Sequence, residues 1–199
     1  AVEEASSCGK ITGAHCDSLE GAREAILAGV RSIEHTQLDE GTADLMKKRQ
    51  VQGEEIFYCP TMAARYSIIH NTNPEYAWLT RKASPGDMER KAKAVMLCKE
   101  RNIPVCAGTD TNSPFVRVGD LQKELELYVE AGMTELEAIE TATVNGARLC
   151  MLDTVTGTLE PGKRADFVIL SDNPLEDIRN LRHVVLTCRD GNVLFSSAR

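Results

Sequence analysis

The sequence predicts an α/β protein with a parallel sheet over residues 1–152, followed by a small β-rich unit over residues 153–199. Up to about residue 150, short apolar runs alternate with amphipathic stretches of helical period. Strands that alternate with helices in this way form βαβ units and a parallel sheet. After Leu152 the long helical stretches stop, and short apolar runs separated by turn residues follow. We therefore place a domain boundary near Leu152.

The first half of the sheet unit is expected to hold strands and helices in strict alternation. Ser18 and Gly29 bound the first helix, because a serine side chain accepts from free N–H groups at a helix start and glycine adopts the left-handed conformation that closes a helix. A second helix is expected to begin at about Asp39. In chain order, the elements are expected over residues 10–15, 18–28, 30–35, 39–49 and 55–60.

The second half contains further helix signals around one more strand. Ser84 and Pro85 mark a helix start, since proline suits the first turn of a helix. Gly132 ends another helix, and Thr134 with Glu137 forms a capping-box pattern for the one after it. The elements are expected over residues 84–101 (helix), 103–108 (strand), 120–131 (helix) and 134–149 (helix).

Residues 65–86 show no clear period and are long for a loop in a compact domain. Loops of this length are often binding segments or lids. The second interpretation is a short extra helix around residues 75–82 that covers one end of the sheet. Beyond the boundary, strands and turns are expected over residues 157–162, 165–170, 184–188 and 192–195.

The composition excludes several classes of function. The net charge of −7 comes without a cluster of lysine or arginine, so neither nucleic acid nor an anionic membrane is an expected partner. No apolar run approaches the roughly 20 residues that span a bilayer. The seven cysteines are odd in number and scattered, which predicts reduced thiols and a cytoplasmic location. The first residues do not resemble a signal peptide and lack an initial Met, so we expect the chain to begin partway through a longer gene product.

Three polar residues occupy equivalent places in the expected sheet. His15 and His35 end two strands, and Asp110 follows another. The carboxyl ends of parallel strands lie at one edge, where α/β sheets and barrels bind ligands. Two imidazoles and a carboxylate there predict a site for Zn²⁺ or a similar ion. Taken singly, each residue also fits a purely structural role. A histidine at a strand end is often hydrogen-bonded to the backbone, and an aspartate after Gly-Thr is common in a turn or helix cap.

Other residues are assigned by position. Neighbouring side chains on a strand point to opposite faces, so Cys16 and Glu34 are expected to lie outside the site, with Glu34 toward the helix layer. His70 lies in the long segment and is a candidate substrate contact, whereas His183 is expected at the surface or in packing. The sequence holds no Gly-x-Ser-x-Gly elbow, phosphate-binding loop or dinucleotide-binding glycine motif.

Six segments resemble the amidohydrolase superfamily, most closely its imidazolonepropionase-like and zinc-dependent Xaa-Pro dipeptidase branch. Individually each match is modest, but together they span nearly the whole chain in the family's order. The segments are GAH at 13–15, AILAGVRSIEH at 25–35, PTM at 60–62, AGTD at 107–110, AIETATVNGA at 138–147 and GTLEPGKRADFVI at 157–169.

The resemblance implies a fold, a cofactor and a reaction. Residues 1–152 would be the C-terminal half of a (β/α)8 metallo-dependent hydrolase barrel, equivalent to strands five to eight, and residues 153–199 a portion of the flanking β-sandwich. His15 and His35 would be metal ligands, and Asp110 a ligand that also transfers the proton. One or two divalent ions, with Zn²⁺ as the default, would activate water to hydrolyse amide, cyclic amide or dipeptide bonds. Arg65 and Tyr66 would contact this small-molecule or dipeptide-like substrate.

The departures from the family pattern are as informative as the matches. The first-strand His-x-His pair is absent, and so is the bridging Lys or Glu of the fourth strand. The region that should hold them would precede Ala1, so we expect half of an enzyme. The alternative is a non-catalytic fragment or pseudoenzyme that pairs with another chain, either the missing N-terminal half or a second copy in a homo-oligomer.

Overall fold

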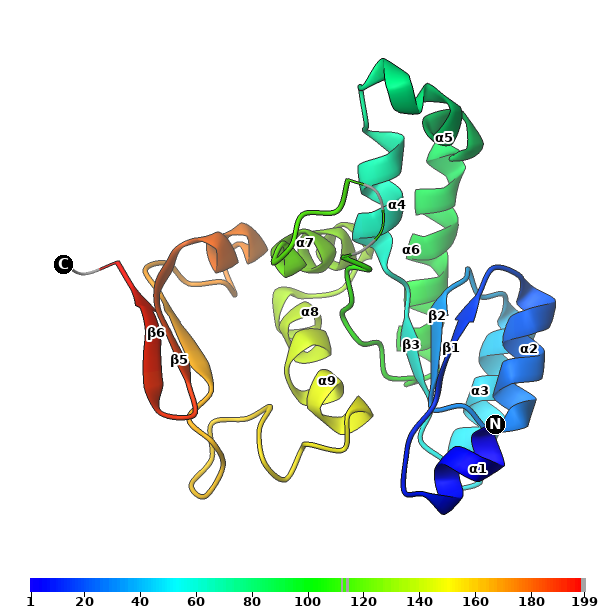
Figure 1. The fold of residues 1–199 in the computed structure, drawn as a ribbon, viewed down its shortest axis with the longest axis horizontal. Coiled ribbons are helices and arrows are strands. Elements are labelled where there is room, and N and C mark those ends of the chain that lie inside the picture. The colour runs from blue at the N-terminus through cyan, green and yellow to red at the C-terminus, as the bar shows by residue number, and fades with distance from the viewer. Residues whose placement is uncertain (112, 114, 198–199) are drawn as a thin grey trace.

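A computed structural model describes residues 1–111, 113 and 115–197 of the chain. After an unexpected helix α1 (Val2–Ser7), the expected alternation follows in the order β1, α2, β2, α3, β3 (Figure 1). The bounds of these elements are β1 (Gly13–Cys16), α2 (Leu19–Ala28), β2 (Ser32–His35), α3 (Glu40–Val51) and β3 (Phe57–Cys59). Ser18 caps α2 through its side chain, and Gly29 closes it in the left-handed region at φ 95°. The predicted α/β class is therefore confirmed.

Strands β1, β2 and β3 form a parallel sheet in that order. Ile33 pairs with Ala14 on one side and with Tyr58 on the other. Ile33 and Tyr58 are fully buried and belong to the same core as Ile26 of α2 and Met46 of α3. Helices therefore cover one face of the sheet, with α2 and α3 beside it in Figure 1.

Glu34 does not face the helix layer, contrary to the prediction. Its Oε1 accepts a hydrogen bond of 2.5 Å from the Ser32 hydroxyl, two residues away on the same face of β2. Ile33 between them points to the helices, so strand alternation sends Ser32 and Glu34 to the opposite face. The prediction failed because it assigned Glu34 relative to His35, and His35 leaves strand geometry with φ 69°.

The fourth expected strand is reduced to one bridge, in which Val105 pairs with Tyr58 in the parallel sense. Cys106 N–H donates to the Tyr58 carbonyl at 2.8 Å, but Ala107 N–H turns away and donates to Thr141 at 3.1 Å. This diversion explains why residues 103–108 follow β3 only briefly. Among the described residues the strands do not close into a barrel, and the half-barrel interpretation stays a prediction.

Residues 62–100 form a helical hairpin that projects from the sheet (Figure 1). The short-helix interpretation of residues 75–82 matches the structure, and a helix also occupies residues 62–69, which the sequence did not predict. Ser84 and Asp87 complete a capping box at the start of the last helix. The elements are α4 (Met62–Ile69), η1 (Pro74–Tyr76), α5 (Ala77–Lys82) and α6 (Pro85–Glu100).

The helix expected over residues 134–149 is divided in two. Thr143, at φ −117° and ψ −88°, separates the two parts, and the nearby Thr141 carbonyl accepts from Ala107 instead of serving only its own helix. The capping box of Thr134 and Glu137 is present as predicted. The helices are α7 (Leu121–Ala131), α8 (Glu135–Ala142) and α9 (Val144–Leu149).

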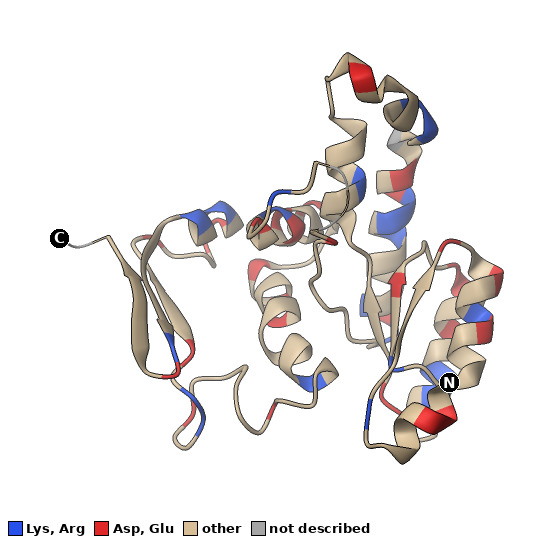
Figure 2. Cartoon of the chain, viewed as in Figure 1, with Lys and Arg blue, Asp and Glu red and all other residues tan. Residues whose placement is uncertain are grey.

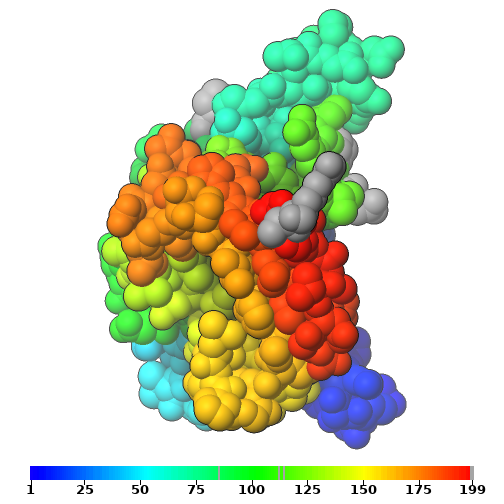
Figure 3. Space-filling model, turned by 90° about the vertical axis from the view of Figure 1, so that its left-hand side faces the viewer, coloured from blue at the N-terminus to red at the C-terminus, as the bar shows by residue number. Residues whose placement is uncertain are grey.

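A separate antiparallel sheet, in the order β4-β5-β6, lies within residues 153–199. Residues 157–162 hold bends and a turn but no strand. Ile178 is buried in the same hydrophobic core as α7, so the unit packs on the helices through η2. Figure 3 shows this unit, orange to red, on the face turned to the viewer. Its elements are β4 (Phe167–Leu170), η2 (Ile178–Arg182), β5 (Val184–Arg189) and β6 (Asn192–Ser196).

Charges of both signs are mixed over the helices (Figure 2). All seven cysteines, which lie in the described ranges, are free thiols, in agreement with the sequence prediction. In the described part of the chain, each helix is too short or too polar to cross a membrane. The domain boundary near Leu152 stays a prediction.

Candidate active site

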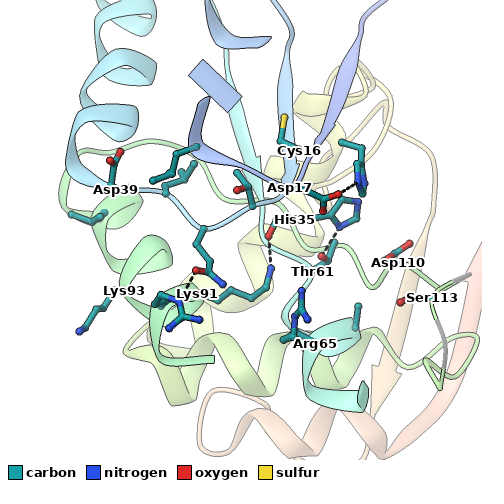
Figure 4. A pocket seen from close by; sticks show the side chains of 18 of the residues that line it. Cys16, Asp17, His35, Asp39, Thr61, Arg65, Lys91, Lys93, Asp110 and Ser113 are labelled. Atoms are coloured by element: carbon teal, nitrogen blue, oxygen red, sulfur yellow. Dashed lines mark hydrogen bonds and ion pairs between the residues drawn. The ribbon is translucent and has the colours of Figure 1, made fainter. Parts of the chain in front are cut away.

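A cavity of about 560 Å³ opens at the carboxyl ends of β1 and β2. Four of the residues predicted for the site line it: His15, His35, Arg65 and Asp110. Each comes from a different segment, namely β1, β2, α4 and the loop after the Val105 bridge (Figure 4). The parallel register brings the strand ends together, which is why residues 20 positions apart or more meet here.

His15 and His35 face each other across neighbouring strand ends. Their ring centroids are 4.6 Å apart, and the ring planes are tilted by 58°. The His15 side chain is 66% exposed, with Nε2 3.3 Å from the Asp17 carboxylate. His35 is half-buried, and its Nδ1 is hydrogen-bonded to Thr61 Oγ1 at 2.8 Å. The Nε2 atom of His35 is thereby the ring nitrogen left for a ligand.

The surroundings of His35 favour its neutral form. Burial is the main cause and lowers the pKa of His35, the nearby Asp110 carboxylate opposes it, and His15 and Lys91 lower the pKa further. Metals bind the neutral imidazole, so the protonation state that the site favours is the one that a metal requires.

Asp110 shares the cavity but stands apart from the histidine pair. It is exposed and adopts a left-handed conformation with φ 52°. Among the described residues, no three His, Cys, Asp or Glu side chains are grouped closely enough to hold a metal ion together. The donor types therefore suit a divalent cation, but within the described chain they amount to an imidazole pair and a separate carboxylate.

The two remaining predicted substrate residues lie outside this cavity. Tyr66, on α4, stacks on His70 with ring centroids 3.9 Å apart. The ammonium of Lys123, which belongs to α7, lies 4.2 Å from the centroid of the Tyr66 ring. Arg65 does line the cavity, with its guanidinium 3.6 Å from the Asp87 carboxylate. Adjacent positions on one helix point in different directions, which separates Arg65 from Tyr66.

Sequence reasoning missed Lys91 and Glu124, two buried residues whose side chains bind backbone groups next to the cavity residues. Lys91 is 3% exposed and donates to the backbone carbonyls of His35 and Pro60. Burial is the main cause that lowers the pKa of Lys91 to about 8. Figure 4 shows its ammonium reaching the end of β2 beside the cavity.

Glu124 is fully buried and caps the start of α4. Its two carboxylate oxygens accept from Met62 N–H at 2.8 Å and Ala63 N–H at 2.5 Å. Burial, the largest cause, raises the pKa of Glu124 to about 7, although these hydrogen bonds act in the opposite direction. The sequence did carry a signal, because Glu124 falls on the apolar face of its helix beside Leu125 and Tyr128, where a carboxylate needs a partner.

The carboxyl ends of parallel strands are where α/β sheets and barrels bind their ligands. The comparison with protein families identifies the family of this chain. Residues 1–194 match the amidohydrolase family model. The chain belongs to the amidohydrolase family.

Individual relatives agree with this assignment. The chain is 34% identical over 185 residues to ochratoxinase of Aspergillus niger, covering 89% of this chain and 36% of the relative. The crystal structure of A. niger ochratoxinase is similar with a TM-score of 0.81 and 29% identity, covering 99% of this chain and 44% of that one. A crystal structure of a Xaa-Pro dipeptidase gives a TM-score of 0.83 and 30% identity, covering 96% and 46%. The chain thus spans about a third to a half of the relatives it matches.

Proposed function

We propose that the chain supplies part of the active site of a metal-dependent hydrolase that cleaves carbon–nitrogen bonds in amides, cyclic amides or dipeptide-like molecules. The observation that carries the proposal is that the rings of His15 and His35 face each other, with centroids 4.6 Å apart, in a cavity that Asp110 also lines. Family membership and the named relatives, an ochratoxinase and a Xaa-Pro dipeptidase, support hydrolysis of this type.

His15 and His35 would hold one or two divalent ions, with Zn²⁺ as the first candidate and Asp110 as a further ligand. Imidazole nitrogen and carboxylate oxygen are the donors that Zn²⁺ accepts in proteins, and other divalent ions tolerate them as well. When bound, such an ion lowers the pKa of water and polarises a carbonyl group. Since the described residues offer no group of three ligands, the remaining ligands would come from outside them.

The chain's own residues would bind the substrate and move the proton. Asp110, exposed in the cavity, accepts a proton from the attacking water and returns it to the leaving amine, which is general base and general acid catalysis by one carboxylate. Arg65 presents a guanidinium to the cavity and would hold an oxygen of the substrate. Tyr66 and His70 stay candidates for substrate contact at the margin of the site.

Metal content tests the proposal directly. The chain, purified without chelator, is measured by mass spectrometry beside His15→Ala/His35→Ala and the control His183→Ala. His183 pairs with Asp172 in the C-terminal unit, so its loss removes an exposed imidazole elsewhere in the fold. We expect about one equivalent of zinc in the parent and the control, and none in the double mutant, because the double mutant lacks both imidazoles that the chain would contribute to the site. Zinc retained in the double mutant would refute the assigned ligands.

The alternative function is a non-catalytic chain that associates with another chain. The ungrouped ligands favour it, as does the edge of β1, which has no strand beyond it in the described part of the chain. It predicts that neither the parent nor the double mutant holds metal. If the parent chain binds zinc only after a chain with the missing ligands is added, the result favours the hydrolase and not the non-catalytic alternative.

A further inference from the structure

The start of α4 is built in an unusual way that concerns His35. Thr61 is the N-cap residue, a position where a threonine side chain normally accepts from the N–H groups of the first turn. Here Thr61 is in the left-handed region, at φ 48° and ψ 52°, and its side chain makes no capping hydrogen bond. Its hydroxyl is instead hydrogen-bonded to His35 Nδ1 at 2.8 Å.

Glu124 performs the capping that Thr61 does not. It reaches from α7, and its carboxylate accepts from the N–H groups of Met62 and Ala63. Thr61, Met62 and Ala63 are 5%, 2% and 3% exposed, so water has little access to these N–H groups. Without Glu124, two buried donors would lack a partner, and the hydroxyl of the N-cap residue Thr61 is the side-chain oxygen that normally serves such groups.

Lys91 fixes the backbone on both sides of this contact. Its ammonium donates to the carbonyl of His35 and to that of Pro60, the residue before Thr61. One buried cation thus ties the end of β2 to the residues that lead into α4. His35 and Thr61 both have positive φ, a conformation that costs free energy for residues other than glycine and persists where the surroundings impose it.

We propose that Glu124 is a positioning residue for His35: by capping α4 in place of Thr61, it reserves the Thr61 hydroxyl for His35 Nδ1 and directs Nε2 to the cavity. In this arrangement Nδ1–H donates to the Thr61 oxygen, and the lone pair of Nε2 is free. The proposal rests on the proposed function only in taking His35 as a metal ligand. Groups that orient a metal-binding histidine through its second nitrogen typically change metal affinity 10- to 100-fold when removed, as an order of magnitude.

The test compares Glu124→Gln with Glu126→Gln in the chain labelled with ¹⁵N-histidine. Glu126 lies two positions away on α7 and pairs with Arg182 and Lys123, away from His35, so its loss is the matched control. Long-range ¹H–¹⁵N spectra without metal report which nitrogen of His35 carries the proton, and titration with Zn²⁺ reports affinity. We expect the Nδ1–H tautomer in the parent and the control. Glu124→Gln should show mixed tautomers and bind Zn²⁺ roughly 10-fold or more weakly.

Two results would overturn the proposal. One is an Nε2–H tautomer in the parent, and the other is a folded Glu124→Gln variant with the tautomer and Zn²⁺ affinity of the parent. If Glu124→Gln does not fold, Thr61→Ala and Thr61→Ser decide, because only serine keeps the hydroxyl. Serine should retain the Nδ1–H tautomer and alanine should lose it, and equal spectra would refute the proposal.

Failure of the proposed function has a different signature. If the parent shows the Nδ1–H tautomer but binds Zn²⁺ no better than His35→Ala, the metal role of His35 is wrong while the positioning by Glu124 stands. The spectra are recorded without metal, so they test the positioning whether or not Zn²⁺ binds.

Discussion

At the scale of single residues, the cavity combines side chains that are individually ordinary. His35 differs from an average strand-end histidine because burial lowers its pKa and Thr61 occupies one of its nitrogens. Asp110 differs from an average turn aspartate because it lies in the same cavity as that imidazole. The chemistry proposed for the site depends on this combination.

Asp110→Asn is expected to lower turnover by the whole enzyme at least 100-fold, because an amide cannot accept the proton from water. Asparagine tolerates a positive φ as aspartate does, so the loop at φ 52° should keep its conformation. Hydrolysis of small amide and dipeptide substrates, with circular dichroism as the check on folding, measures the effect. Asp172→Asn, at the partner of His183, is the control, and near-normal turnover in Asp110→Asn would contradict the role of Asp110.

Glu124 also predicts how stability depends on pH. Burial raises its pKa from 4.5 to about 7, so between these values the folded chain holds a proton that the unfolded chain has released. The contribution is fully present below pH 4.5 and is lost as the pH rises through about 7. The total change is on the order of 3 kcal/mol. Urea unfolding at pH 5, 6, 7 and 8 measures it.

Glu124→Gln should remove this part of the pH dependence, whereas Glu126→Gln should keep it. If the unfolding free energy of the parent changes between pH 5 and pH 8 by the same amount as that of Glu124→Gln, Glu124 does not titrate in this range.

At the scale of elements, the backbone at Gly157 packs closely against α9 and the residue before it. A Cβ added to Gly157 would lie 2.6 Å from the Ala147 Cβ and 3.2 Å from the Thr143 carbonyl oxygen. Both contacts are with atoms that cannot swing aside, and Gly157 has φ 93°. The residue is therefore required for its lack of a side chain as well as for its backbone conformation.

Gly157→Ala should destabilise the chain clearly more than Gly162→Ala. Gly162 has the same φ of 93° but nothing within 4 Å of an added Cβ, so it reports the backbone cost alone, about 1–2 kcal/mol. The difference between the two variants, read from urea unfolding, isolates the steric contact. Equal destabilisation would mean that the turn moves away from α9 at little cost.

At the scale of the whole molecule, the chain exposes apolar surface on its second sheet. Several large apolar side chains of β4 and β6 are about half exposed or more: Val168, Ile169, Val193, Leu194 and Phe195. This surface agrees with a chain that spans about a third to a half of its relatives.

The sequence by itself determined the alternation of elements, the parallel sheet and the residues at its carboxyl edge. Local signals suffice for these, because caps at Ser18, Ser84 and Thr134 and the glycines at 29 and 132 act through neighbouring backbone groups. The parallel register then brings the ends of the His15 and His35 strands together. The positive φ of His35 turns its ring toward that of His15. The family followed from the order of six short motifs.

Only the tertiary structure decided which buried groups contact the backbone next to the cavity and on which face of the parallel sheet Glu34 lies. Glu124 and Lys91 act on His35 through backbone groups that are 30 or more positions distant in sequence, and no local pattern encodes such contacts. The Ala107–Thr141 hydrogen bond, which shortens the fourth strand and lies at the break between α8 and α9, is equally non-local. Local propensity fixes where elements begin and end, whereas burial and hydrogen bonding between distant segments decide how their last residues are turned.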